Sequence, residues 1–261
     1  MNTVIVPVDF SETSRNSAFY ATKLLTGHYG VEMILYHVYD KASQAAEAES
    51  QIEKLKAELM EAGIVKISTM VEEGKDLIHE LETLARHRRA DLIIMGITGR
   101  HALGKVFLGS NTLKIVEQKV CPVLIIPPNA QFKEIKNVML ASDFKEAVKS
   151  TPSVPVKKVL KTFQPSLHIV NVDNKHYVSL TEEYQDSRAG LKEMFKEFNP
   201  EFYFLGMNDV DEAINQFAHD KNIDFITIIH REHSLLDRMF RTSHTKKLAY
   251  QSNIPVLAVH E

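Results

Sequence analysis

The chain has 261 residues, a length that favours two domains, and its 44% hydrophobic and 25% charged residues are typical of globular proteins. Its 31 basic and 34 acidic residues give a formal net charge of −3, which argues against a nucleic-acid partner. The single cysteine, Cys121, excludes an intrachain disulfide and fits a reducing compartment, and its apolar neighbours predict a buried thiol.

The chain begins with MNTVIVPVDF, which lacks the charged and long apolar regions of a signal peptide. No apolar run reaches the roughly 20 residues that a membrane-spanning helix needs. We therefore expect a cytoplasmic protein that makes no membrane contact.

The first half of the chain alternates short apolar runs with helical stretches. The runs are rich in Val, Ile and Leu, as parallel strands covered by helices on both faces must be. We expect strands over residues 3–8, 32–38, 65–71, 91–96 and 122–127, and helices over residues 14–27, 45–62, 76–88 and 111–119. This alternation favours a doubly wound sheet, which binds ligands beyond the carboxyl ends of its strands, where the strand order reverses.

The second half of the chain repeats the first at an offset of 134 residues, which falls to 133 after one deletion. The matched pairs are 4–10 with 138–144, 35–41 with 169–175, 90–96 with 223–229, and 121–126 with 254–259. A period this long indicates a duplicated domain rather than a solenoid. We place domain 1 at residues 1–130 and domain 2 at residues 134–261, joined by the linker PPNAQFKE.

The most informative stretch covers residues 95–112 and reads MGITGRHALGKVFLGSNT. Gly96, Gly99 and Gly109 allow a ligand to come close to the backbone. A helix that begins near Ser110 presents free N–H groups to an anion. These features predict a phosphate-binding loop, and a loop whose serine only caps the helix is the alternative.

The same stretch nearly matches a P-loop, through Gly99-x4-Gly104-Lys105. Val106, however, stands where that motif has the Ser or Thr that binds magnesium. The loop also follows the fourth predicted strand, and its helix is expected after Gly109. The sequence therefore disfavours a P-loop.

Gly96-x2-Gly99-x9-Gly109-Ser110 is similar to the G-2x-G-9x-G-(S/T) signature of the universal stress protein family. The runs PVDFSETS, LYHVYD and CPVLIIP also resemble that family. The whole chain resembles a tandem universal stress protein, more weakly in domain 2. This resemblance implies an α/β fold of two doubly wound domains. Each would have a five-stranded parallel sheet in the order 3-2-1-4-5 with helices on both faces, and ATP would bind between strands 1 and 4.

The resemblance also implies a set of ATP-binding residues in domain 1. Asp9 would lie beside the adenine, Pro7 and Val8 would line the base pocket, and Val38 would contact the adenine through its backbone. The phosphate loop would begin at Met95 and Gly96, and the ribose and phosphates would be held by Gly99, Gly109, Ser110 and Asn111. The residues alone leave a second interpretation of Asp9, as a carboxylate at a helix N-terminus.

Domain 2 departs from this pattern. Ile229, Glu232 and Thr242 replace the three glycines at an offset of 133. Glu232 would repel a phosphate, and the other two side chains would block close approach to the backbone. We therefore expect ATP in domain 1 only. Asp143, Val172 and Ser243 are retained, which leaves open a remnant of the base site in domain 2.

The stretch of domain 2 that corresponds to the predicted loop also contains three histidines, His230, His233 and His244, beside Asp237. Their spacing suggests metal ligands, but most histidines in a polar loop bind no metal. We therefore assign no metal ligand, and leave open a metal or a phosphate-free adenine compound as the ligand of domain 2.

Paired carboxylates, a nucleophile–base pair and a complete P-loop are all missing near the predicted loop, so we assign no catalytic residue. We expect an ATP-binding regulatory module of the stress response, with ATP bound with or without Mg²⁺. The alternatives are a slow ATPase or self-phosphorylating enzyme, and a structural interaction protein with a vestigial site.

The closing strands of the two domains, within residues 122–127 and 255–260, are apolar edge candidates. In single-domain members of the family such strands join two subunits, as the resemblance implies. We expect the duplication to turn that contact into an intrachain pseudo-dimer, and a homodimer of chains stays open.

Overall fold

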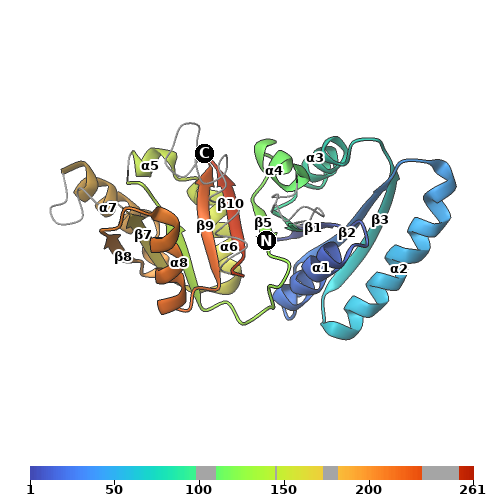
Figure 1. Ribbon diagram of the computed structural model, residues 1–261, viewed down its shortest axis with the longest axis horizontal. Helices are drawn as coiled ribbons and strands as arrows, with labels where there is room; N and C mark the ends of the chain where they lie inside the picture. The colour runs from blue at the N-terminus through green and yellow to red at the C-terminus, as the bar shows by residue number, and fades with distance from the viewer. Residues whose placement is uncertain (98–109, 145, 173–181, 231–252) are drawn as a thin grey trace. The chain divides into compact units, whose positions relative to one another are not determined.

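The computed structural model describes residues 1–97, 110–144, 146–172, 182–230 and 253–261. The chain divides into two compact units, Met1–Phe132 and Lys133–Glu261 (Figure 1). Within the described ranges, every helix is too short or too polar to cross a bilayer.

The N-terminal unit contains a parallel sheet in the order β3-β2-β1-β4-β5, as predicted. Its strands are β1 (Thr3–Pro7), β2 (Glu32–Tyr39), β3 (Lys66–Glu73), β4 (Leu92–Gly96) and β5 (Val123–Ile126). Its helices are α1 (Glu12–Leu25), α2 (Ala45–Ala62), α3 (Leu77–Arg88) and α4 (Ser110–Glu117), and a short 3₁₀ turn, η1 (Ala42–Gln44), precedes α2. The predicted strands and helices are confirmed, with ends that differ by at most two residues.

The helices cover both faces of this sheet. Figure 1 shows α1 and α2 on one side of it, and α3 and α4 on the other. Side chains set where two of the helices begin: Ser11 accepts a hydrogen bond from the Ser14 N–H at the start of α1, and Asp76 accepts one from the Ile78 N–H at the start of α3. Strand residues such as Ile5 are fully buried between these layers, and Cys121 is buried as predicted.

The C-terminal unit repeats this sheet in the order β8-β7-β6-β9-β10. Its strands are β6 (Asn137–Ala141), β7 (Ser166–Val172), β8 (Glu201–Leu205), β9 (Phe225–His230) and β10 (Val256–His260). Its helices are α5 (Ala147–Ser150), α6 (Ser153–Phe163), α7 (Glu182–Met194) and α8 (Val210–Asp220), with the 3₁₀ turn η2 (Lys196–Phe198). The two doubly wound α/β units are therefore established.

The first helix of the C-terminal unit is divided in two, unlike α1. Helix α5 ends at Ser150, and α6 begins at Ser153 after Pro152. A residue before proline avoids the helical conformation, and Thr151 is extended at ψ 113°. Pro152 therefore explains the interruption.

One carboxylate in each unit ties the starts of two neighbouring strands together. Asp91, just before β4, accepts hydrogen bonds from the backbone N–H groups of Asn2 and Thr3. Asp224, 133 residues later, accepts the same bonds from Lys136 and Asn137, at 2.7 and 2.8 Å. The duplication predicted from the sequence thus extends to individual hydrogen bonds.

Candidate functional site

A cavity of about 270 Å³ lies in the N-terminal unit, at the carboxyl ends of β1, β2 and β4. The first turns of α1, α3 and α4 complete its wall. Strands β1 and β4 are neighbours in the sheet, and the strand order reverses between them. This is where a doubly wound sheet binds its ligands. The lining residues are Pro7, Val8, Asp9, Thr13, Ser14, His37, Val38, Asp40, Gly74, Lys75, Leu77, Met95, Gly96, Asn111 and Thr112.

Most of the residues implied by the sequence resemblance meet at this cavity. Those that line it are Pro7, Val8, Asp9, Val38, Met95, Gly96 and Asn111. Helix α4 begins at Ser110, as the sequence predicted. Gly99 and Gly109 lie outside the described residues, together with Gly104, Lys105 and Val106 of the disfavoured P-loop.

Asp9 follows β1 and lies at the mouth of the cavity. Its Oδ1 accepts hydrogen bonds from the Ser11 N–H at 3.0 Å and the Ser11 hydroxyl at 2.6 Å. Partial burial raises the pKa of Asp9, but the hydrogen bonds from Ser11 and Ser14 outweigh it and hold the pKa below its ordinary value. Asp9 is therefore an ionised acceptor beside the cavity, and it also orders the turn that leads into α1.

Gly96, at the end of β4, lies against the first turn of α1. A Cβ atom at this position would lie 2.7 Å from both Thr13 Cγ2 and the Thr13 carbonyl oxygen. The Gly96 carbonyl accepts a hydrogen bond from Thr112 Oγ1 of α4 at 3.2 Å. The glycine thus allows β4, α1 and α4 to converge at one corner of the cavity.

Three helix N-termini face the cavity. Thr13 and Ser14 belong to the first turn of α1, Leu77 to that of α3, and Asn111 and Thr112 to that of α4. The positive end of a helix dipole and its free N–H groups favour a negatively charged ligand. This arrangement suits an anion-bearing ligand better than a neutral apolar one.

Two charged side chains, one from the turn after β3 and one from the segment after β2, lie at the opening of the cavity. Gly74 donates its N–H to the Tyr39 carbonyl at 2.9 Å, which holds the turn beside the end of β2. Lys75 and Asp40, from these two segments, are exposed and line the opening. Among the described residues neither charged group forms an ion pair, so both are available to a ligand.

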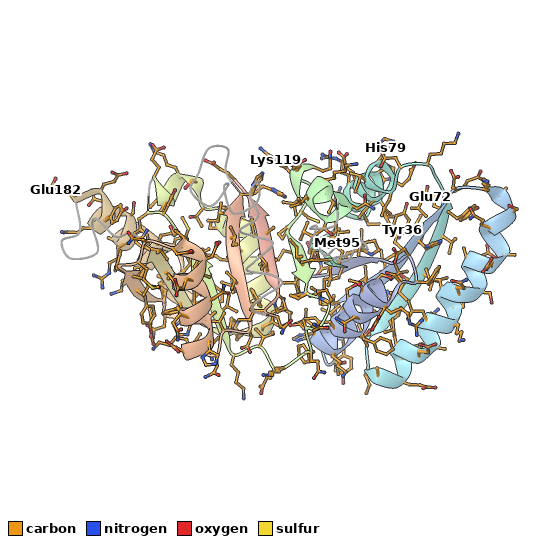
Figure 2. The ribbon with its side chains drawn as sticks, in the orientation of Figure 1. Tyr36, Glu72, His79, Met95, Lys119 and Glu182 are labelled. Carbon is orange, nitrogen blue, oxygen red and sulfur yellow. The ribbon has the colours of Figure 1, made fainter. Side chains whose placement is uncertain are left out.

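A buried tyrosine supports the wall next to Val38. The Tyr36 side chain is fully buried, and its hydroxyl donates to Glu72 Oε2 at 2.6 Å. Figure 2 shows the two side chains close together, from β2 and β3. Burial, together with the bond to Glu72, raises the pKa of Tyr36, so the hydroxyl stays protonated and the bond persists at neutral pH.

Sequence reasoning missed part of the lining, namely Thr13, Ser14, His37, Asp40, Gly74, Lys75, Leu77 and Thr112. They lie in helix first turns or next to strand ends, and carry no motif of their own. The predicted fold could have indicated these residues, because a doubly wound sheet brings the segments that follow its strands to one edge.

The C-terminal unit differs at this corner. Ile229 stands at the position of Gly96 and is buried, while Ala147 stands at the position of Thr13. Alanine lacks the Cγ2 atom, one of the two Thr13 atoms that a Cβ at position 96 would meet at 2.7 Å. Glu232 and Thr242 lie outside the described residues.

The histidines singled out in the sequence are only partly described. His230 is buried at the end of β9, with its ring centroid 6.4 Å from that of His260 on β10. His233, His244 and Asp237 lie outside the described residues. Within the described ranges no three metal-ligating side chains come together.

Comparison with known proteins identifies the family. The model of the universal stress protein family matches residues 1–127 and 159–260. A universal stress protein of Methanocaldococcus jannaschii is 30% identical over 138 residues, which cover 47% of this chain and 80% of the relative. One from Synechocystis sp. is 28% identical over 249 residues, which cover 89% of this chain and 82% of the relative.

Solved structures agree with this result. The crystal structure of a universal stress protein from Archaeoglobus fulgidus matches with a TM-score of 0.68 at 20% identity, covering 100% of this chain and 96% of that one. At this identity the match concerns the fold alone. The family model, however, accounts for most of both units. The chain therefore belongs to the universal stress protein family.

Proposed function

We propose that the N-terminal unit binds ATP and that the protein acts in the cytoplasm as a nucleotide-dependent regulatory module of the stress response. One observation carries this proposal: one cavity at the strand-order switch is lined by seven of the residues that the resemblance to the family implies for ATP. Those residues come from segments far apart in the sequence, so their meeting is not a consequence of chain proximity.

The residues that line the cavity suit both the base and the phosphates of a nucleotide. Asp9 and Val38 offer hydrogen-bonding groups beside the apolar Pro7 and Val8, as recognition of a base requires. Gly96 and the first turn of α4 line the same cavity, and the N–H groups of a helix N-terminus suit phosphates. The cavity of about 270 Å³ is slightly smaller than typical ligand sites of roughly 300–1,000 Å³, which fits a base and its sugar.

We propose one nucleotide per chain. Ile229 places a side chain where the first unit has Gly96, and the sequence puts Glu232 and Thr242 in place of the other two glycines. Each lost hydrogen bond to a charged phosphate oxygen costs about 1.5–3 kcal/mol. Losing several of them removes most of the roughly 8–12 kcal/mol that micromolar to nanomolar binding represents.

A regulatory role is preferred over catalysis because, among the described lining residues, those proposed to hold the phosphates include no nucleophile–base pair and no paired carboxylates. Asp9, the ionised carboxylate, is proposed to contact the base. The slow ATPase or self-phosphorylating enzyme, and the structural protein with a vestigial site, remain the competing hypotheses.

Mass spectrometry of small molecules released from the purified chain separates these hypotheses. Intact ATP supports binding, ADP or a phosphorylated Ser or Thr supports turnover, and no nucleotide supports a vestigial site. Calorimetric titration of the full chain with ATP, with and without Mg²⁺, then gives the stoichiometry. Two ATP molecules per chain would overturn the assignment to one unit.

Pairing of the closing strands within one chain stays a prediction. Sedimentation of the full chain tests whether chains also associate as homodimers.

A further inference from the structure

The hydrogen bonds of β2 alternate between its two neighbouring strands. Glu32 N–H donates to the Asn2 carbonyl, and the Tyr36 carbonyl accepts from Val8 N–H, both at 2.8 Å and both on the β1 side. The Tyr39 carbonyl instead accepts from Gly74, on the β3 side. By this alternation, Val38 directs its backbone N–H and carbonyl toward the β1 side.

Strand β1 ends before it can pair with Val38. The parallel register stops at Pro7 opposite Tyr36. In a longer ladder, the Val38 N–H would donate to the Val8 carbonyl. Among the described residues that bond is absent, and Val38 lines the cavity at this point.

His37 takes the place of the missing ladder bond. Its Nδ1 lies 2.7 Å from the Val8 carbonyl oxygen. A carbonyl only accepts, so Nδ1 must carry the proton. The Phe10 ring, with its centroid 4.5 Å from that of His37, packs against the imidazole and restrains it. The Val8 carbonyl is thereby satisfied without using the Val38 N–H.

The C-terminal unit contains the same arrangement with a different side chain. Ser142 N–H donates to the Val170 carbonyl at 2.9 Å, and the ladder stops at Ala141 opposite Val170. Asn171, 134 residues after His37, donates its Nδ2–H to the Ser142 carbonyl at 3.0 Å. In both units a side chain donates a hydrogen bond to this carbonyl, from an imidazole in the first unit and from an amide in the second.

We propose that His37 is a positioning residue for base recognition: by holding the Val8 carbonyl, it keeps the Val38 N–H free to donate to a ring nitrogen of the bound base. This inference rests on the proposed binding of ATP in the N-terminal unit. Without the donor at position 37, the Val8 carbonyl would accept a hydrogen bond from the Val38 N–H. That N–H would then no longer be available to the base.

The test compares His37→Leu, which has no donor, with His37→Asn, which copies the C-terminal unit. Calorimetry with the full chain should show ATP binding about tenfold more weakly to His37→Leu, the worth of roughly one hydrogen bond. Affinity for inorganic tripolyphosphate should not change, because that ligand has no base. His37→Asn should recover most of the ATP affinity. Equal losses for ATP and tripolyphosphate, or no loss for ATP, would overturn the proposal.

Amide hydrogen exchange of the ligand-free protein provides a second measurement, read by NMR at Val38. The Val38 amide should exchange at least tenfold more slowly in His37→Leu than in the wild-type or His37→Asn proteins, because it becomes hydrogen-bonded. Identical exchange in all three would refute the role of His37. If the wild-type chain binds no ATP, the proposed function fails, while this exchange measurement still decides the role of His37.

Discussion

The Thr112 hydroxyl donates a hydrogen bond to the Gly96 carbonyl and is almost fully buried. The bond joins α4 to the end of β4, across the segment that carries the other two signature glycines. The two ends of that segment are therefore held in a fixed relation by one side chain. The position of the cavity corner at Gly96 therefore depends on this packing between β4 and α4.

Gly96→Ala should destabilise the N-terminal unit and weaken ATP binding. The added Cβ would lie 2.7 Å from the Thr13 carbonyl oxygen as well as from its Cγ2, so rotating the Thr13 side chain cannot relieve the clash. Overpacking of this kind typically costs about 1–3 kcal/mol. Urea denaturation measures the stability, and calorimetry measures the affinity for ATP.

Gly30→Ala is the matched control for this experiment. A Cβ at Gly30 would meet nothing within 4 Å, so we expect unchanged stability and affinity. A Gly96→Ala protein as stable as Gly30→Ala, with wild-type affinity, would show that the close approach of β4 and α1 is not required.

Asp9→Asn should weaken ATP without affecting inorganic tripolyphosphate. Asparagine keeps the acceptor oxygen that orders the Ser11 turn but loses the negative charge beside the proposed base site. Asp9→Ala should also lose the hydrogen bonds from the Ser11 N–H and hydroxyl, each of which contributes about 0.5–1.5 kcal/mol of stability. Calorimetry with both ligands and urea denaturation separate the two roles.

An Asp9→Asn protein that loses ATP and tripolyphosphate equally would show that Asp9 acts on the phosphate end. A protein with normal affinity for both would leave Asp9 only its role at the start of α1.

Cys121 should resist thiol reagents in the native protein at pH 8. Burial, together with the negative charge of Asp91, raises the pKa of the Cys121 thiol to about 12. The reactive thiolate is therefore scarce until the pH approaches that value. We expect modification more than roughly a hundredfold slower than in the unfolded chain. Reaction with a chromogenic disulfide reagent, with and without guanidinium, measures both rates, and similar rates would contradict the burial of this thiol.

Local sequence signals were sufficient to predict the strands and helices of the N-terminal unit. Runs of Val, Ile and Leu predicted the strands, and the nearly constant offset between four pairs of matched segments predicted the duplication. Contacts between distant segments were harder, because a residue such as Lys75 has no local signal that it will line a cavity. The bond from His37 to Val8 depends on where a ladder stops, which periodicity does not determine.

The division of the first helix in the C-terminal unit shows a similar limit. Pro152 signals a break, but the matching change from Thr13 to Ala147 becomes meaningful only once Gly96 is found against α1. The alanine removes one of the two close contacts that a side chain at the position of Gly96 would make, and sequence alone does not show that these two positions meet.

The bonds made by Asp91 and Asp224 lie at the starts of the strands, whereas the cavity lies at their carboxyl ends. The bonds that hold the strands in register and the proposed ligand site thus lie at opposite edges of the same sheet. Substitutions at the carboxyl edge leave the Asp224 bonds in place, so one copy of a duplicated domain can change or lose its ligand while its strands stay in register.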